Sequence, residues 1–342
     1  MIKINENKLC EKCFAVLPDS NECDCGYNLN RNDSLSAGFI INGRYIIGRE
    51  LRRSVFMHKY LAYDAVKNNI VTIKEFFPET FVSRDVSGAI NLKNEDELAS
   101  YNYLMQKFIW IMNLSQKADE EICIKAKEVF YSNNTVYFVE KNLSAVSLSD
   151  CIKKDCDFND KEAINAIHRL LSILELSDYP GNTICDSTVL VLEDKSVVFD
   201  GFDLTDNDYK KIITDSVVSG QNLNYLPVKS FIEENTEKYV NLFSIGAVAY
   251  TMLTKKTPGS PFEEERFDFT LLNSVSEDAD LTRLIQKMCS EDNDIKYELL
   301  IKEINTVFKK YGLPECLPSD SNKITHFKKR RFIKKHHNFR KM

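Results

Sequence analysis

The spacing of apolar residues changes near residue 145, and this change constrains the fold more than any other feature. Before it, short runs with strand-like alternation dominate, interrupted by one helical stretch from Glu95 to Leu114. After it, apolar residues recur at helical intervals. The predicted strands are Arg44–Gly48, Lys59–Tyr63, Ile70–Phe76, Lys125–Tyr131 and Thr135–Glu140, and the predicted helices are Lys161–Leu176, Lys238–Leu253 and Leu281–Cys289. The sequence therefore predicts an α+β protein, with a small β-rich unit followed by a helical one.

One β-hairpin is predicted inside the helical part. Thr188–Leu192 and Ser196–Asp200 are short apolar runs separated by Glu193, Asp194 and Lys195. The hairpin would end on a carboxylate, Asp200.

Composition is that of a globular protein, with 43% hydrophobic and 28% charged residues. No window offers the roughly 20 apolar residues of a membrane span, and residues 1–7 lack the apolar core of a secretory signal. These observations predict a cytoplasmic protein.

Charge is distributed unevenly along the chain. Lys323–Met342 holds nine Lys or Arg and no acid, so the net charge of −6 leaves −15 on the remainder. This stretch is the end of the basic tail, residues 314–342, and it mixes cations with aromatic residues, which suits nucleic-acid phosphates or an anionic membrane surface. The alternative is an arm that solubilises the chain or lies against its acidic body.

Four cysteines near the N-terminus have the spacing of a metal site. Cys10 and Cys13, with Cys23 and Cys25 before Gly26, supply four thiolates on two tight turns, as tetrahedral Zn²⁺ requires. Residues 1–30 are therefore predicted to be a zinc-ribbon-like knot with a structural zinc, and 31–39 a polar linker; the alternative is a leader with four reduced thiols. The other cysteines are predicted to be small core residues: Cys123, Cys151, Cys156, Cys185, Cys289 and Cys316.

Several segments resemble one enzyme family. Val71–Glu79 reads V-T-I-K-E-F-F-P-E, preceded by Arg44-Tyr45 and by Tyr60–Asp64, Y-L-A-Y-D. This series is similar to a bacterial, clostridial-type subgroup of Hanks Ser/Thr protein kinases that reads V-A-I-K-E-F/Y-F-P and often carries a zinc ribbon in front.

Three downstream segments extend the resemblance in the family's order. Asn134–Glu140 resembles the strand before the hinge, Val198–Phe202 the strand that delivers the Asp of D-F-G, and Ser244–Pro258 the helix after the activation segment. The resemblance implies a bilobal kinase-like domain over 40–313, with an N-lobe at about 40–145 and a C-lobe at about 146–313.

The segment where the family has its Gly-rich loop holds no glycine. Leu51–Tyr60 contains Arg52, Arg53 and Lys59 instead, and side chains there block the backbone approach to phosphates. The favoured interpretation is a solvated basic hairpin; the alternative is a cluster that attracts an anion.

Two residues of a nucleotide site match the family. Lys74 would face the α- and β-phosphates, and Asp200 would hold Mg²⁺, although Gly201-Phe202 replaces the family's Phe-Gly. The Glu that partners Lys74 in the family falls at about Lys107, so repulsion is expected there. Weak ATP/Mg²⁺ binding and a direct Lys74–Asp200 pair are both left open.

The catalytic loop lacks its base. The family's H-R-D-x-x-x-x-N falls on Gly181–Thr188, which puts Thr183 at the proton-accepting Asp and Thr188 at the metal-binding Asn. A threonine hydroxyl cannot accept a proton near neutral pH. Asp186 is the one nearby carboxylate that could substitute, and His168 is expected to be an ordinary helix residue.

Three scaffold positions also depart from the family. Val228 stands at the Glu of A-P-E, Lys296 near its Arg partner, and Asn241 at the Asp of D-I/V-Y-S. Losing both members of a buried ion pair need not destabilise the protein, unlike losing one.

The leading hypothesis is a pseudokinase, a non-catalytic signalling scaffold or regulator of protein partners, such as an active kinase. The alternatives are an atypical but active Ser/Thr protein kinase using Lys74, Asp200 and Asp186, and a nucleic-acid- or membrane-associated protein acting through its tail.

Overall fold

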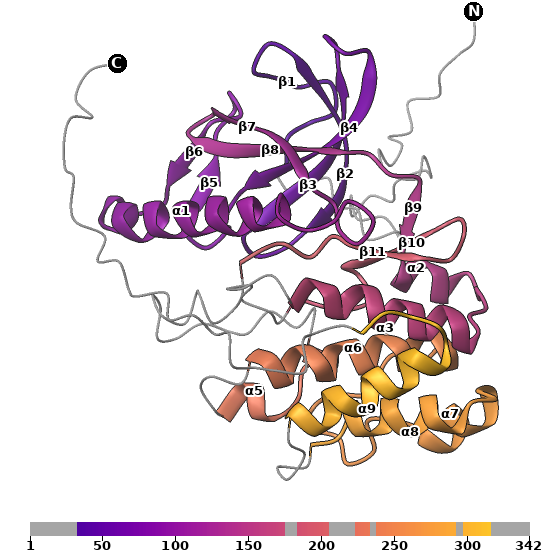
Figure 1. The fold of residues 1–342 in the computed structure, drawn as a ribbon. Coiled ribbons are helices and arrows are strands. Elements are labelled where there is room, and N and C mark those ends of the chain that lie inside the picture. The colour runs from indigo at the N-terminus through magenta and orange to yellow at the C-terminus, as the bar shows by residue number, and fades with distance from the viewer. Residues whose placement is uncertain (1–32, 175–182, 205–222, 233–236, 292–296, 316–342) are drawn as a thin grey trace, which may run out of the picture.

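The computed structural model describes residues 33–174, 183–204, 223–232, 237–291 and 297–315. Figure 1 shows a sheet-rich N-terminal lobe above a helical C-terminal lobe. Within these ranges no helix has the length and apolar character that a membrane crossing needs.

A six-stranded antiparallel sheet forms the N-terminal lobe, in the order β1-β2-β3-β4-β8-β7. The strands are β1 (Ile40–Ile41), β2 (Tyr45–Arg53), β3 (Met57–Asp64), β4 (Asn69–Phe76), β7 (Ala126–Ser132) and β8 (Thr135–Lys141). All five strands predicted for this lobe are confirmed to within two residues at the start and five at the end. The two-residue β1 and the small pair β5 (Val82–Arg84) and β6 (Ile90–Leu92) carry too few residues for the alternation to reveal.

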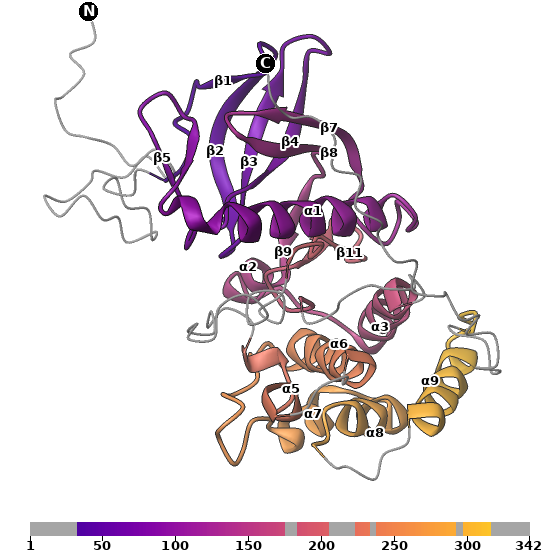
Figure 2. The ribbon, with the colours of Figure 1, turned by 90° about the vertical axis from the view of Figure 1, so that its left-hand side faces the viewer.

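The single helix of this lobe, α1 (Leu98–Ser115), follows the short 3₁₀ turn η1 (Glu95–Glu97). Asn94 caps that turn by accepting from the backbone N–H of Asp96. Most buried residues of α1 lie three or four positions from another, as in an amphipathic helix; the buried residues are Tyr101, Leu104, Phe108, Ile111, Met112, Leu114 and Ser115. Phe108 packs between Phe76 of β4 and Phe138 of β8, so α1 lies against the sheet on the side nearest the C-terminal lobe (Figure 2).

Register in the sheet aligns one exposed apolar row. Ile40, Ile46, Tyr63 and Ile70 are directly opposite one another on β1 to β4, and each is 36% to 58% exposed. The alternate residues of the same strands face a separate buried cluster that includes Tyr45, Tyr60 and Ile73.

The C-terminal lobe begins with a three-stranded sheet in the order β11-β10-β9. Its strands are β9 (Ala145–Ser147), β10 (Val189–Leu192) and β11 (Val197–Phe199). The predicted hairpin is confirmed, with Lys195 of its turn in the left-handed region at φ 63°. The helical elements are α2 (Leu148–Lys153), α3 (Asp160–Leu174), η2 (Leu223–Tyr225), α5 (Lys229–Ile232), α6 (Glu237–Thr254), α7 (Phe269–Val275), α8 (Ala279–Met288) and α9 (Tyr297–Lys310).

Helix α6 is the centre of this lobe and is buried from Val240 to Leu253. Ser244, Thr251 and Thr254 satisfy their hydroxyls by donating to carbonyls four residues earlier, which lets polar residues lie in the core. At Gly246 a Cβ would lie 2.6 Å from the Met288 Cβ, so only glycine allows α6 and α8 to approach this closely.

Candidate functional site

The β2–β3 hairpin, where a phosphate-binding loop would lie, is folded down against the chain that follows β4. Phe77 donates its backbone N–H to Phe56 O at 2.7 Å, and Glu79 donates to Val55 O at 3.0 Å. Ser54 Oγ accepts from the backbone N–H groups of Phe56 and Met57, which closes the turn. The tip of the hairpin is therefore tied to the lobe by its own backbone.

Strand register gathers three charged residues on one face of the sheet. Lys59 of β3 is directly opposite Lys74 of β4. Glu140 of β8 is opposite Thr72, two residues from Lys74 and on the same face. The sheet thus brings two ammonium groups and one carboxylate together.

Asp200 comes from the other lobe, directly after β11, and donates its backbone N–H to Thr188 O at 2.8 Å. The reversed order of Gly201 and Phe202 suits this backbone. A Cβ on residue 201 would lie 2.4 Å from the Phe199 ring, while Phe202 is fully buried.

These residues form a buried ion cluster, which we call the junction cluster: Arg52, Lys59, Lys74, Glu140 and Asp200. The Lys59 ammonium lies 2.7 Å from both carboxylate oxygens of Asp200 and 2.9 Å from Glu140. The Lys74 ammonium lies 3.1 Å from Asp200 and 3.1 Å from Glu140. Arg52 donates to the Asp200 backbone oxygen at 2.9 Å. Both lysines and both acids have side chains at most 5% exposed, so solvent does not screen them.

Burial and charge act in opposite directions on the junction cluster. Burial alone would lower the pKa of Lys74, but Asp200 and Glu140 outweigh it and raise that pKa above its usual value. Burial works to raise the pKa of Asp200, but Lys59, Lys74 and Arg52 hold it well below its usual value. Both groups are therefore charged across the physiological range.

These shifts predict how the cluster's stabilisation depends on pH. A carboxylate with a depressed pKa stabilises the fold above its unfolded-state pKa and loses that contribution as pH falls through the folded-state value. We expect the stability difference between wild type and Asp200→Asn to be constant from about pH 5 to 9 and to shrink below about pH 4. Urea titrations of both proteins at each pH measure it; a difference that grew on acidification would contradict the assignment.

The expectation of a solvated basic hairpin is wrong for Lys59, which is 3% exposed and paired with two acids. The error arose because the sequence does not reveal that Glu140 and Asp200 face this strand. Lys107 lies half-buried on α1. The acid beside Lys74 is Glu140 of β8, which helps to raise the Lys74 pKa, so a cluster partner takes the role that the family gives to a Glu of the helix.

The loop aligned with the catalytic loop is held by the Thr188 hydroxyl. Thr188 Oγ1 donates to Thr183 O at 2.5 Å and accepts from the Cys185 backbone N–H at 3.0 Å, and both threonines are buried. The pKa of Asp186 is raised by burial, and Tyr225 hydrogen-bonds its side chain. Its backbone oxygen accepts from the Ser149 N–H of α2, and its side chain is beside Tyr225 of η2.

His168 is a packed helix residue on α3. Its ring contacts Phe308 edge-on at 5.0 Å, and its Nε2 lies 3.1 Å from Pro314 O. The prediction that it is an ordinary helix residue agrees with these contacts.

An ion pair lies near Val228 and is formed by residues other than those the family alignment suggested. The Glu291 carboxylate accepts from the Val228 backbone N–H at 3.1 Å and from Arg266 at 2.6 Å. Arg266 also donates to Leu226 O at 2.8 Å, and its guanidinium lies over the Phe243 ring. Lys296 lies outside the described residues, so the inferred loss of the family's pair stays a prediction; Asn241 is buried.

We expect Glu291→Ala to lower the free energy of unfolding by about 2 kcal/mol, because Arg266 would stay buried without its acid. Glu303→Ala is the matched control, since the Lys287–Glu303 pair is 41% and 46% exposed and should contribute less than about 1 kcal/mol. Urea denaturation followed by circular dichroism compares them; equal losses would contradict the buried role.

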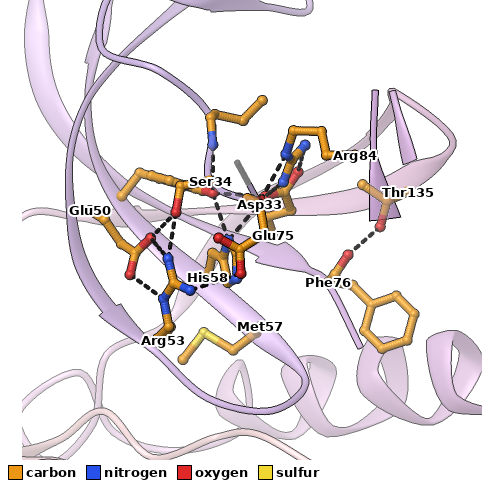
Figure 3. Close-up of polar contacts among 12 residues, drawn as sticks. Asp33, Ser34, Glu50, Arg53, Met57, His58, Glu75, Phe76, Arg84 and Thr135 are labelled. Atoms are coloured by element: carbon orange, nitrogen blue, oxygen red, sulfur yellow. Dashed lines mark hydrogen bonds and ion pairs between the residues drawn. The ribbon is translucent and has the colours of Figure 1, made fainter. Parts of the chain in front are cut away.

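A second buried charge lies on the opposite face of β4, where Glu75 is fully buried (Figure 3). Arg84 of β5 binds it with two hydrogen bonds, of 2.6 and 3.0 Å, and Tyr137 and Tyr60 donate to it at 2.6 and 3.0 Å. Arg84 also donates to Asp33 O at 2.9 Å. Arg53 binds the side chains of Asp33 and Glu50. The described part of the predicted linker is therefore anchored to the sheet.

The four N-terminal cysteines, Cys10, Cys13, Cys23 and Cys25, lie outside the described residues, as do Cys316 and the basic stretch Lys323–Met342. In the part of the chain that is described, no group of three or more His, Cys, Asp or Glu is placed to hold a metal. Cys123, Cys151, Cys185 and Cys289 are buried, as predicted for small core residues, and Cys156 is half-buried.

Comparison with known proteins supports the fold. No family model matches the chain, and no curated protein matches it. Among solved structures, the PpkA-294 apo form matches with a TM-score of 0.64 at 17% identity, covering 80% of this chain and 99% of that one. A mutant of the PknI kinase domain of Mycobacterium tuberculosis matches with a TM-score of 0.56 at 9% identity, covering 82% and 100%.

A third match is Rad53 residues 1–466 in complex with AMP-PNP, with a TM-score of 0.55 at 14% identity, covering 77% of this chain and 64% of that one. The chain therefore has a protein kinase-like fold. At these identities the likeness establishes the fold alone.

Proposed function

We propose that the chain is a pseudokinase, a kinase-like protein that regulates a protein partner without transferring phosphate. The junction cluster carries the proposal. The two groups that would receive nucleotide and metal, Lys74 and Asp200, are bound to each other at 3.1 Å.

Magnesium and phosphate would have to break several contacts at once. Both carboxylate oxygens of Asp200 lie 2.7 Å from Lys59, so a metal ion would displace that ammonium. Lys74 would have to leave its two buried acids, Asp200 and Glu140, to bind a phosphate. The β2–β3 hairpin, where a phosphate-binding loop would lie, is also hydrogen-bonded to Phe77. A buried charge that loses its partner costs several kcal/mol, so nucleotide binding must overcome that cost.

The proposal also assigns no base. Thr188 donates its hydroxyl to the backbone oxygen of Thr183, and neither threonine hydroxyl acts as a base near neutral pH. Asp186 is the carboxylate that would serve in the alternative proposal of an atypical kinase, but its carboxylate is hydrogen-bonded to the Ser187 backbone and to Tyr225.

The partner, the compartment and the appendages belong to the same proposal. The exposed row Ile40, Ile46, Tyr63 and Ile70 supports a protein-binding role, because aligned exposed apolar side chains are common in interaction surfaces. A zinc ion on Cys10, Cys13, Cys23 and Cys25, a cytoplasmic location and a phosphate- or membrane-binding tail remain proposals from the sequence.

Phosphate transfer tests the proposal directly. The purified chain is incubated with radiolabelled Mg-ATP, alone and with a generic basic protein substrate. We expect the wild-type chain to incorporate no more radiolabelled phosphate than the Lys74→Met variant, which lacks the ammonium that the family uses to bind the ATP phosphates. Incorporation that is lost in both Lys74→Met and Asp186→Ala would support the active-kinase alternative and reject ours.

A further inference from the structure

The end of helix α2 has a defined cap geometry. Cys156 donates its backbone N–H to Cys151 O at 3.0 Å, and Asp155 donates to Ile152 O at 3.0 Å. Asp155 is in the left-handed region, at φ 57°. These two bonds and the left-handed residue between them define a Schellman motif.

In that motif the side chains three residues before and two after the cap contact each other, and here both are cysteines. Cys151 is 3% exposed and faces the Cys156 thiol. Burial, followed by the contact with Cys156, raises the pKa of Cys151 to about 11. The 6→1 backbone hydrogen bond of 3.0 Å holds the two Cα atoms within about 7 Å of each other, the upper limit for a disulfide.

The two thiols differ in access. Cys156 is half-buried, whereas the four other described cysteines are buried, so reagents reach the pair through Cys156. Lys255, at the end of α6, bonds Asp155 and Asp157 on either side of Cys156. The segment that carries the accessible thiol is thus tied to the rest of the lobe.

We propose that Cys151 and Cys156 form a reversible disulfide by exchange with a low-molecular-weight disulfide. The Cys156 thiolate attacks one sulfur of the small disulfide, which forms a mixed disulfide and releases one small thiolate. Cys151 then loses its proton to solvent, and its thiolate attacks the Cys156 sulfur. The second small thiolate leaves, so the protein has lost two electrons and two protons and the small disulfide has been reduced to two thiols.

The alternative is that the two cysteines only supply the apolar contact that accompanies this cap. The two cysteines share no residue with the junction cluster, so the test of the disulfide is independent of the test of the pseudokinase proposal. In a reducing compartment such a bond would form transiently, under oxidising conditions.

Peptide mapping of the full-length chain tests the disulfide. The protein is incubated with oxidised glutathione, free thiols are blocked with N-ethylmaleimide under denaturing conditions, and a tryptic digest is analysed without reduction. Trypsin cleaves after Lys153 and Lys154, so the bond joins two peptides, 142–153 and 155–161, each with one cysteine. We expect this linked pair to appear, and to be lost on adding dithiothreitol and in Cys156→Ser.

Cys151→Ser is the matched control, because it retains the accessible thiol but not its partner. It should hold a glutathione adduct on Cys156 that does not resolve, with circular dichroism confirming that it is folded. The proposal is overturned if wild-type Cys156 also stops at the glutathione adduct, if it links to a cysteine elsewhere in the chain, or if both thiols are recovered unreacted.

Discussion

Replacing Asp200 with asparagine is expected to lower the free energy of unfolding by about 3 to 5 kcal/mol, as removal of one partner of a buried ion pair does. The substitution leaves Lys59, Lys74 and Arg52 facing Glu140 as their one acid in the junction cluster. Because the lysines are 4% and 0% exposed, water cannot replace the lost carboxylate. Urea denaturation followed by circular dichroism measures the change.

A double-mutant cycle with Lys59→Met separates charge balance from lost packing. Lys59→Met alone leaves Lys74 and Arg52 against two acids, so it should cost less than Asp200→Asn. The double variant removes one charge of each sign and should recover part of the loss, with a coupling of about 1 to 3 kcal/mol. Strictly additive effects would show that the cluster is not electrostatically coupled.

Arg84→Met is expected to lower the free energy of unfolding by about 3 kcal/mol or more. Glu75 would keep its hydrogen bonds from Tyr137 and Tyr60 but lose its bidentate cation, while remaining fully buried. The anchor on Asp33 O would be lost as well. The same denaturation experiment measures the effect.

Arg53→Met is the matched control, since Arg53 is 18% exposed and its partners Glu50 and Asp33 are 23% and 31% exposed. Solvent screens these ions, so the loss should be near 1 kcal/mol, or roughly a third of that for Arg84→Met. If the two arginine variants lose equal stability, Glu75 does not depend on Arg84 in the way its contacts indicate.

The fold was predictable because its strands and helices carry clear apolar spacing. Alternation in a run such as Ile70–Phe76 predicts a strand, and the helical spacing of the apolar residues of α1 predicts a helix. The order of the kinase-like motifs along the chain predicts how these elements are connected. Strands of two or three residues, such as β1 and β5, hold too little of the alternation to be recognised. Their pairing depends on distant partners, which local spacing does not encode.

The site was predictable only where single residues matched a motif. Lys74 and Asp200 were identified this way, and their direct pairing was one of two outcomes left open. Glu140 was missed because it ends an ordinary apolar strand, and its role appears only from the register that places it two residues from Lys74 on one face. Two features of the sequence could have indicated the cluster. They are the acid Glu140 at the end of an apolar strand and Lys59 at a position of β3 where an apolar residue would be expected.

Glu291 and Arg266 show the same limit. They are 25 residues apart in sequence and match no position of the family's motifs, but they meet beside Val228. Their pairing depends on the tertiary fold, which brings both charges beside the buried backbone N–H of Val228.

Calorimetric titration of Mg-ATP into the full-length protein tests the central claim most directly. If the junction cluster closes the nucleotide site, binding should be weaker than a Kd of about 1 mM, or about −4 kcal/mol, in wild type. The same titration of Lys59→Met, which frees one face of Asp200, serves as the comparison. Wild-type binding in the micromolar range that is lost in Lys74→Met would contradict the account.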